Sequence, residues 1–303
     1  MMEIDLPEID AEELEKIKEA KSLEALADPE IAERIALGEI TPEFVRKNVY
    51  YFNLYKRDKD LCKDCTGLSE CAKKSNHLQI FLKIQGDRVD VNYRKCPYQN
   101  EVDLLKKKFV SRQFEETAFG YKMKDCLSYF AKSRYPIVKK MNEIVRGFPD
   151  EKGLYLCGDP GTGKSFLLSV FAVRLAKEPS TKSISFIDCG NEFSAMQNCF
   201  RDNMTMFRYY LEEMQEVQYL FLDDLGKEFK SEFVLMDLLL PVFRYRKEKK
   251  LKTFVSSNYE IKELKSAYPY PVGHKKMTEE LRSLVEESCS EMKLQGMKFE
   301  VLK

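Results

Sequence analysis

A glycine-rich segment that ends in a lysine and a serine is the part of the sequence best suited to chemistry. It runs Gly158-Asp159-Pro160-Gly161-Thr162-Gly163-Lys164-Ser165 and follows the apolar run 154–157. This is the pattern G-x-x-x-x-G-K-[ST] between a strand and a helix, in which backbone N–H groups and the helix N-terminus hold phosphate. We therefore predict a nucleotide site where Lys164 reaches the β- and γ-phosphates and the Ser165 hydroxyl ligates Mg²⁺.

Two adjacent carboxylates follow another apolar run. Asp223 and Asp224 end the segment Tyr219-Leu220-Phe221-Leu222. A carboxylate at the end of a strand beside a phosphate loop can hold Mg²⁺, and a second one can polarise the attacking water. We assign these roles to Asp223 and Asp224 in that order. Because aspartate is shorter than the glutamate often found at the second position, Glu228 is an alternative base.

A third apolar run ends in an amide. The segment 252–257 leads to Asn258. An asparagine at a strand end beside the phosphates can hydrogen-bond the γ-phosphate or the attacking water. We predict that Asn258 senses whether the γ-phosphate is attached.

A cluster of thiols and one imidazole lies in the first half of the chain. Four of the nine cysteines and one of the two histidines fall within 35 positions, at Cys62, Cys65, Cys71, His77 and Cys96. These side chains suit tetrahedral Zn²⁺, and Cys-x-x-Cys is a common start of such a site. We predict a closed structural site of Cys62, Cys65, His77 and Cys96, with Cys71 as the alternative ligand. Reduced thiols without a metal are the competing interpretation.

The elements that would position the phosphate site alternate between short apolar strands and helices. This rhythm predicts an α/β fold with a parallel sheet flanked by helices. The expected strands are 154–157, 183–188, 218–222 and 252–256, the expected helices are 164–177, 191–200, 204–215 and 232–248, and a last strand is expected at about 297–302. The cysteines in this half and just before it lie among apolar residues and are predicted to be core side chains: Cys126, Cys157, Cys189, Cys199 and Cys289.

The first half has a different character. Residues 1–58 are predicted to form three short helices, the third being an aromatic-rich helix at 42–57 that needs packing partners. The cysteine-rich segment 59–100 contains two short strands with Gly86-Asp87 as their turn, 101–145 is a basic helical linker, and 146–303 is the α/β domain. Residues 1–40 carry a net charge of −9, from 13 acidic and 4 basic side chains.

Composition excludes several classes of protein. The chain has 303 residues, of which 44% are hydrophobic and 33% charged, so it can bury a core. No apolar run approaches the roughly 18 residues of a membrane span, and the first residues lack the pattern of a signal peptide. We therefore expect a cytoplasmic protein without a membrane partner.

Taken together, the motifs resemble one family, the bacterial replicative-helicase loaders of the DnaI/DnaC type. The resemblance rests on the Cys-x-x-Cys pair, His77 and the segments 93–97, 153–158, 222–228 and 253–258. It implies a C-terminal AAA+ domain that lacks the helical lid and an N-terminal helical and zinc-binding domain, formed by 1–58 and 59–100, that binds the hexameric helicase. It also implies an ATPase that uses Mg²⁺, contacts single-stranded DNA, meets other primosomal proteins and self-associates through its AAA+ domain.

The sequence departs from the family at the arginine finger. Lys276 occupies the family position, and a lysine lacks the planar fork of arginine. Arg282 is a possible replacement, and Arg246, which keeps the family spacing to Thr253, could contribute at a subunit face. An ordinary solvated helix is the competing interpretation of Lys276 and Arg282.

The expected DNA surface is the helix 204–215 with its neighbour. Arginine and aromatic side chains cluster there, a combination that suits phosphate contact and base stacking. They are Arg201, Arg208, Tyr209 and Tyr210. An ordinary amphipathic helix is the alternative.

Three other functions fit parts of the sequence. A transposition-helper ATPase of the IstB type shares the phosphate site but does not account for the cysteine cluster. An adaptor with a degenerate ATPase is consistent with Asp224 and Lys276. A P-loop kinase of small metabolites would need a lid with clustered arginines, which the sequence lacks.

Overall fold

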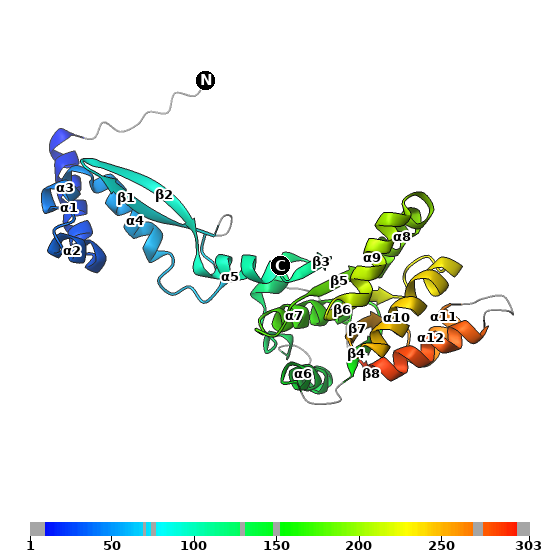
Figure 1. The fold of residues 1–303 in the computed structure, drawn as a ribbon. Helices are drawn as coiled ribbons and strands as arrows, with labels where there is room; N and C mark the ends of the chain where they lie inside the picture. Colours follow the sequence, from blue (N-terminus) through cyan, green and yellow to red (C-terminus); the bar gives the residue numbers. More distant parts are fainter. Residues whose placement is uncertain are drawn as a thin grey trace, which may run out of the picture. The chain divides into compact units, whose positions relative to one another are not determined.

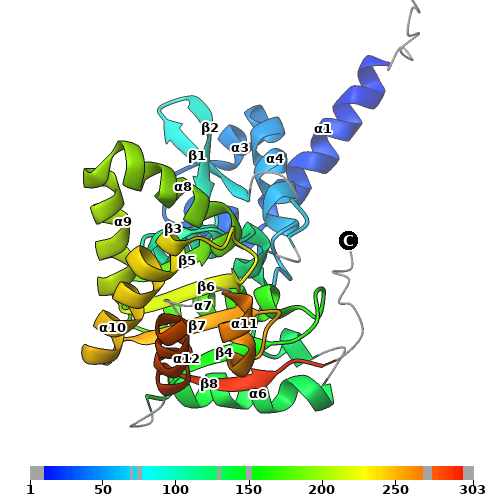
Figure 2. The ribbon, with the colours of Figure 1, turned by 90° about the vertical axis from the view of Figure 1, so that its right-hand side faces the viewer.

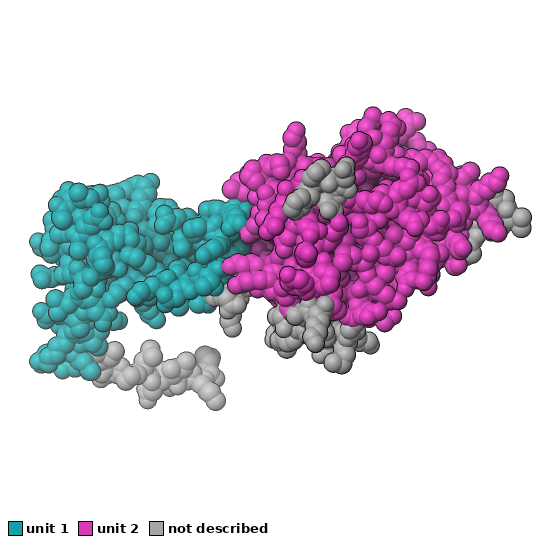
Figure 3. All heavy atoms as spheres, turned by 90° about the horizontal axis from the view of Figure 1, so that it is seen from below, with its two compact units in different colours: residues 1–101 teal, residues 102–303 magenta. Residues whose placement is uncertain are grey.

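A computed structural model describes residues 10–68, 71–73, 77–127, 131–147, 152–268 and 275–295. The chain divides into two compact units, Met1–Glu101 and Val102–Lys303 (Figure 3). The division falls within a helix, α5 (Pro97–Lys106).

The first unit begins with four helices rather than the three that the sequence predicts. They are α1 (Ala11–Leu26), α2 (Pro29–Ala36), α3 (Pro42–Lys47) and α4 (Val49–Asp60). Side chains of Asp10, Asp28 and Thr41 cap the first three helices. The expected single helix at 42–57 was wrong because Asn48 leaves the helical region and ends α3 by hydrogen-bonding the carbonyl of Phe44 at 3.0 Å.

A β-hairpin completes this unit. Strands β1 (Leu78–Gln85) and β2 (Arg88–Lys95) pair antiparallel around the Gly86-Asp87 turn, as the sequence predicts. The core contains Ala25, Ile31, Ile40, Val45, Phe52 and Val89, so one face of α4 packs inward. Tyr50 on the same helix is 70% exposed.

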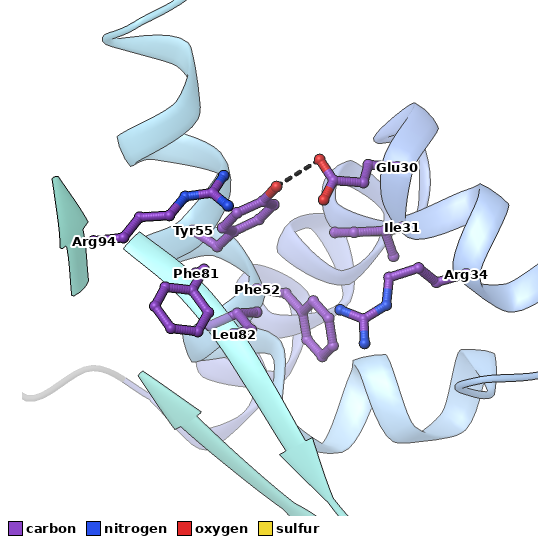
Figure 4. Close-up of a pocket in the computed structure, with 8 residues that line it drawn as sticks. All are labelled: Glu30, Ile31, Arg34, Phe52, Tyr55, Phe81, Leu82 and Arg94. Carbon is purple, nitrogen blue, oxygen red and sulfur yellow. Dashed lines mark hydrogen bonds between the residues drawn. The ribbon is translucent and has the colours of Figure 1, made fainter. Parts of the chain in front are cut away.

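A small pocket of about 90 Å³ opens in the first unit (Figure 4). Tyr55 from α4 donates a hydrogen bond to Glu30 of α2 across it. Arg94 of β2 lies over the ring of Phe81, 5.9 Å from its centroid. The hydrogen bond ties α2 to α4.

The second unit is built on a six-stranded sheet whose neighbouring strands all pair in parallel (Figures 1 and 2). The order is β3-β5-β6-β7-β4-β8. The strands are β3 (Phe109–Arg112), β4 (Gly153–Cys157), β5 (Ile184–Asp188), β6 (Tyr219–Leu225), β7 (Lys252–Ser257) and β8 (Cys289–Lys293). The predicted α/β sheet is confirmed.

Helices cover both faces of this sheet. Phe221 and Phe254 pack against Phe171 of α7 (Lys164–Ala176), whereas Leu220 and Leu222 belong to the core on the other face. That core is covered by α8 (Cys189–Asp202), α9 (Met204–Glu216), the π-helical turn η4 (Val234–Leu239), α10 (Leu240–Glu248), α11 (Leu264–Ala267) and α12 (Lys275–Ser288). Shorter elements are η2 (Glu116–Gly120), η3 (Asp125–Leu127), α6 (Ala131–Val145) and η5 (Ile261–Glu263).

Two strands differ from the sequence-based expectation. The segment 101–145 was expected to be helical, but it contributes β3, which pairs with β5 at the edge of the sheet. The strand β8 pairs with β4 but was not predicted, and the strand expected at 297–302 lies outside the described residues. In the part of the chain that the structure describes, no helix is both long and apolar enough to cross a bilayer.

Candidate nucleotide-binding site

The glycine-rich loop lies where its pattern requires, between β4 and α7, at the carboxyl end of the central strands. This is the edge of an open parallel sheet where ligands bind. Gly161 and Gly163 have φ values of 81° and 89°, which side chains rarely tolerate. A Cβ atom on Gly158 would lie 2.3 Å from the carbonyl oxygen of Leu294, so only glycine fits there.

Lys164 is buried at the start of α7, with 4% of its surface exposed. Its Nζ donates to the carbonyl oxygens of Gly158 at 2.8 Å and Asp159 at 3.0 Å, and to Oδ1 of Asn258 at 2.9 Å. Burial lowers the pKa of this lysine. The structure thus brings together two residues that the sequence places 94 positions apart.

Asp223 lies at the end of β6 beside Ser165 and Ser256, and is 8% exposed. Both hydroxyl groups hydrogen-bond its carboxylate. The pKa of Asp223 is raised to about 6, chiefly by burial and in smaller part by the neighbouring charge of Asp224, while the hydrogen bonds from the two hydroxyls lower it. A hydroxyl and a carboxylate side by side are the hard oxygen donors that Mg²⁺ prefers, so this pair fits the cation.

Asp224 has a left-handed backbone with a φ of 57°. Its N–H donates to Oγ of Ser256 at 2.8 Å, and its carboxylate is paired with Lys227. A water-polarising base needs a free oxygen, so the ion pair with Lys227 competes with that role.

Glu228 does not fit the role of alternative base. It is buried and accepts hydrogen bonds from the N–H of Gly226 at 2.7 Å and from the hydroxyl of Tyr268. Both carboxylate oxygens are therefore occupied within the protein. Its position supports the turn after β6.

A pocket of about 320 Å³ lies beside Ser165 and Asp223, the two residues whose oxygens fit Mg²⁺. Ser165, Phe166 and Asp223 line it, and so do residues of the segment 113–121: Gln113, Phe114, Glu115, Thr117, Ala118 and Tyr121. Tyr121 packs edge-on against Phe166, with 5.0 Å between ring centroids. The site therefore has open volume next to its carboxylate and hydroxyl.

Arg134 of α6 supports the loop from outside the motif. It is 1% exposed, and its guanidinium donates to the carbonyl oxygens of Thr162 at 2.9 Å and Cys126 at 3.2 Å. Sequence reasoning missed this residue because α6 was read only as a basic linker. The lone arginine carries no motif that would have marked it.

Comparison with known proteins adds to this geometry. Over 218 residues the chain is 27% identical to the replicative helicase loader DnaI of Bacillus subtilis, an overlap of 69% of this chain and 68% of the relative. The chain is similar to helicase loaders of the DnaI type. The resemblance that the motifs indicated is thereby confirmed. No protein-family model matches the chain.

Solved structures support the fold. A crystal structure of DnaI matches with a TM-score of 0.54 and 22% identity, covering 64% of this chain and 98% of that one. A candidate primosome component from Streptococcus pyogenes matches with a TM-score of 0.51 and 22% identity, covering 65% and 98%. At this identity the likeness concerns the α/β fold alone.

The structure separates the three residues considered for the arginine finger. Arg246 is 1% exposed, and its guanidinium is saturated: it donates to Thr253 Oγ1 and to the carbonyl oxygens of Met214, Gln215, Val217 and Lys252 at 2.7–3.1 Å. That placement does not fit a side chain that reaches another subunit. Burial lowers the pKa of Arg246, and the carbonyl acceptors favour its charged form.

The other two finger residues lie on α12. Arg282 is paired with Glu279 at 2.7 Å and Glu286 at 2.6 Å on its own helix. Lys276 is exposed. Glu280, which stands where the family has a second arginine, binds Arg244 through two hydrogen bonds of 2.7 and 2.8 Å. Of the three, Lys276 alone is exposed and forms no ion pair with another described residue.

The expected DNA surface on α8 and α9 is mixed. Arg201 and Arg208 are exposed and Tyr209 is 56% exposed, whereas Tyr210 packs against the core. A pocket beside Tyr209 is lined by three glutamates, Glu212, Glu213 and Glu216. These carboxylates oppose a phosphate backbone at that end of α9.

The thiol and imidazole cluster is not arranged as a metal site. In the ranges described, no three His, Cys, Asp or Glu side chains stand where they could hold a metal ion together. Parts of a site are nevertheless present: Cys96 is buried and its Sγ accepts from the N–H of Gln99 at 3.3 Å. The Nδ1 atom of His77 is buried, and no described residue hydrogen-bonds it. A buried ring nitrogen is normally hydrogen-bonded or bound to a metal ion.

Proposed function

We propose that this protein is a loader of the replicative DNA helicase that binds and hydrolyses ATP. The observation that carries the proposal is the phosphate loop, with Lys164, Ser165, Asp223 and Asn258 converging on it, in a chain similar over 218 residues to a named helicase loader. The proposed activity is that of an AAA+ ATPase acting in replication initiation or restart.

The residues have distinct proposed roles. The loop amides from Gly158 to Ser165 bind the phosphates, and Lys164 exchanges its loop carbonyls for the β- and γ-phosphate oxygens. Ser165 and Asp223 hold Mg²⁺, which neutralises the charge that develops on the phosphates. Asn258 binds the γ-phosphate or the attacking water. Asp224 orients that water once it separates from Lys227.

The proposed partners follow the two units. The first unit binds the hexameric helicase, and the second contacts single-stranded DNA, self-associates and meets other primosomal proteins. The similarity to DnaI supports the helicase as the partner. On α4, Tyr50 is 70% exposed and Tyr51 is 37% exposed, and we propose that these two aromatic side chains contribute to docking.

Zinc in the first unit is a separate proposal. The spacing of Cys62, Cys65, His77 and Cys96 supports it, and so does the buried Nδ1 of His77. The ligands would have to move together to bind, so zinc would reorganise this part of the unit. Elemental analysis of the full chain is expected to give about one zinc per molecule, lost in a Cys62→Ser, Cys65→Ser variant. A metal-free folded chain would contradict this proposal.

The test of the main proposal is capture of the helicase. The full chain is mixed with the replicative helicase of the same source, and the mass of the complex is measured by light scattering with and without ATP and Mg²⁺. A stable complex is expected. Lys164→Ala should lose ATP hydrolysis while staying folded, whereas Lys182→Ala, an exposed lysine elsewhere in the unit, should keep it. Absence of any complex in both nucleotide states would remove the helicase from the proposal.

The specific alternative is an adaptor with a weak ATPase. The ion pair of Asp224 with Lys227 and the lysine at position 276 favour it. Helicase capture with no detectable hydrolysis, even with DNA and helicase present, would decide for the adaptor.

A further inference from the structure

A basic pocket lies at the amino ends of the parallel strands, whereas the phosphate loop lies at their carboxyl ends. It has a volume of about 290 Å³ and is lined at the first residues of β4 and β7 and the last residue of α12. Its lining carries four lysines and one carboxylate, Lys152, Lys247, Lys250, Lys252 and Glu287, together with Arg246, whose guanidinium is buried and bonded within the protein. The proposed ATPase site does not use any of these groups.

Within this lining, one ion pair offsets part of the positive charge. Lys247 is paired with Glu287, and Lys152 donates to the backbone carbonyl of Glu286 at 3.0 Å, which carries no net charge. In the turn that leads into β7, Lys249 and Lys250 are both exposed. An anion at this place would meet several lysines at once.

A polar atom without a partner also lines the pocket. The Oγ atom of Ser288 is buried, and no group in the described ranges hydrogen-bonds it. Buried hydroxyls are normally hydrogen-bonded, so an unsatisfied one marks a place where a ligand can supply the missing partner. A hydroxyl can donate to a phosphate oxygen.

The amino ends of the strands carry the opposite charge on the other side of the sheet, near β3 and β5. There the pocket beside Tyr209 is lined by Glu212, Glu213 and Glu216. A polyanion that approaches these strand ends is therefore repelled at the β3 and β5 side and attracted at the β4, β7 and β8 side. Lysines serve phosphate as point charges without demanding a fixed geometry, which suits a flexible backbone.

We propose that this basic pocket, lined by Lys152, Lys247, Lys250, Lys252 and Ser288, binds the phosphate backbone of single-stranded DNA. The inference rests on the proposed loader function, because it supplies the strand on which such a protein would act. It places the contact away from the α9 surface that the sequence favoured. The phosphates contact the lysines, and Ser288 donates to one phosphate oxygen.

The experiment measures the affinity of the full chain for a labelled oligothymidylate at 50–200 mM salt, with Mg²⁺ and ATP. A Lys152→Gln, Lys250→Gln variant should bind more weakly, and its log–log salt slope should be shallower by about 1.4 if each lysine meets one phosphate. Across this salt range the affinity ratio of the parent to the variant should then shrink about sevenfold. The matched control is Lys139→Gln, Lys265→Gln, which removes two exposed lysines elsewhere in the second unit and should keep the slope.

A charge-neutral variant tests the pocket independently. Ser288→Ala should lower the affinity about two- to tenfold and leave the salt slope unchanged, because it removes a hydrogen bond but no charge. Unaltered thermal unfolding would show that each variant is folded.

Several outcomes would overturn the inference. One is an unchanged salt slope in the Lys152→Gln, Lys250→Gln variant, and another is an equal change of slope in the control. A third is that the Lys152→Gln, Lys250→Gln variant loses helicase capture but keeps DNA binding, which would make the pocket a protein-docking surface. A parent chain that binds no DNA would also overturn it. Helicase capture, measured in parallel, then shows separately whether the loader function stands.

Discussion

Replacing Asp223 by asparagine is expected to inactivate the protein and stabilise its nucleotide-free form at the same time. The buried carboxylate has a pKa of about 6, against 3.8 for an exposed aspartate, and burial is the main cause. A raised carboxyl pKa means that the folded state holds its proton more tightly than the unfolded state. Ionisation therefore costs stability, and the cost is complete above pH 6 and absent below pH 3.8.

The magnitude follows from that difference. About 2 units at about 1.4 kcal/mol each give close to 3 kcal/mol at pH 7.5. Asparagine keeps an oxygen that can accept from Ser256 and removes the charge, so Asp223→Asn should gain most of this free energy. At pH 5 the gain should fall to about half, because the wild-type carboxyl is then mostly protonated.

The assay is the free energy of opening of β6 and β7, measured by hydrogen exchange with mass spectrometry without nucleotide or Mg²⁺. These central strands report on the second unit even if the first unfolds separately. Asp224→Asn is the matched control: it removes the neighbouring carboxylate, which is paired with Lys227, and asparagine tolerates its left-handed backbone. A loss of stability in Asp223→Asn, or an equal gain at both pH values, would refute the reasoning.

Three further predictions concern the scaffold. Arg246→Met should lower the free energy of unfolding, measured by thermal unfolding, by at least about 3 kcal/mol, because it leaves four carbonyls without their donor. It should not change ATP hydrolysis per folded molecule. A selective loss of hydrolysis would restore the role of Arg246 at a subunit face. Gly153→Ala should cost about 3 kcal/mol because the new Cβ would lie 1.8 Å from the carbonyl oxygen of Thr253, whereas Gly190→Ala, with 3.3 Å to a side-chain oxygen, should cost far less in the same unfolding measurement. In the first unit, the hydrogen bond from Tyr55 lowers the pKa of Glu30 below 4.5. The stability that this hydrogen bond adds is therefore present above pH 4.5 and is lost as the pH falls through the lowered pKa. Urea unfolding of Tyr55→Phe followed by circular dichroism should show a loss under about 1 kcal/mol at pH 7 that shrinks as the pH falls below 4.5; a loss independent of pH would contradict this.

The central sheet could be predicted because each of its inner strands is a short apolar run followed by a polar residue with a chemical role. Asp223 and Asn258 mark such ends, the phosphate loop begins directly after β4, and parallel pairing brings the carboxyl ends of these strands together. The contact of Lys164 with Asn258 follows from that topology.

The edge strands could not be predicted in the same way. β3 has the sequence Phe-Val-Ser-Arg and β8 has Cys-Ser-Glu-Met-Lys, so neither is a continuous apolar run. Each is held by backbone pairing to one neighbour, β5 or β4, and that long-range pairing leaves no local signature. For the same reason Arg246, whose acceptors lie on α9 and β7, was expected at a subunit face and not inside the domain.

The first unit shows the limit of composition as a guide. The thiols and the imidazole predicted a metal site, but the described residues do not converge as ligands, because spacing along the chain does not fix where β2 and the turn after α4 meet. Local signals do not depend on such long-range contacts: Asp28 and Thr41, each followed by a proline, cap the start of α2 and α3.

The hydrogen bond from Arg134 to the carbonyl oxygen of Thr162 has a consequence for judging related chains. The phosphate-binding signature spans eight positions, yet one of its backbone groups is held by a side chain 28 residues upstream. Two homologues can therefore share an intact signature and differ in how firmly their loop is preorganised. Surveys that score such proteins by the signature alone would group them together, whereas the residue at position 134 would tell them apart.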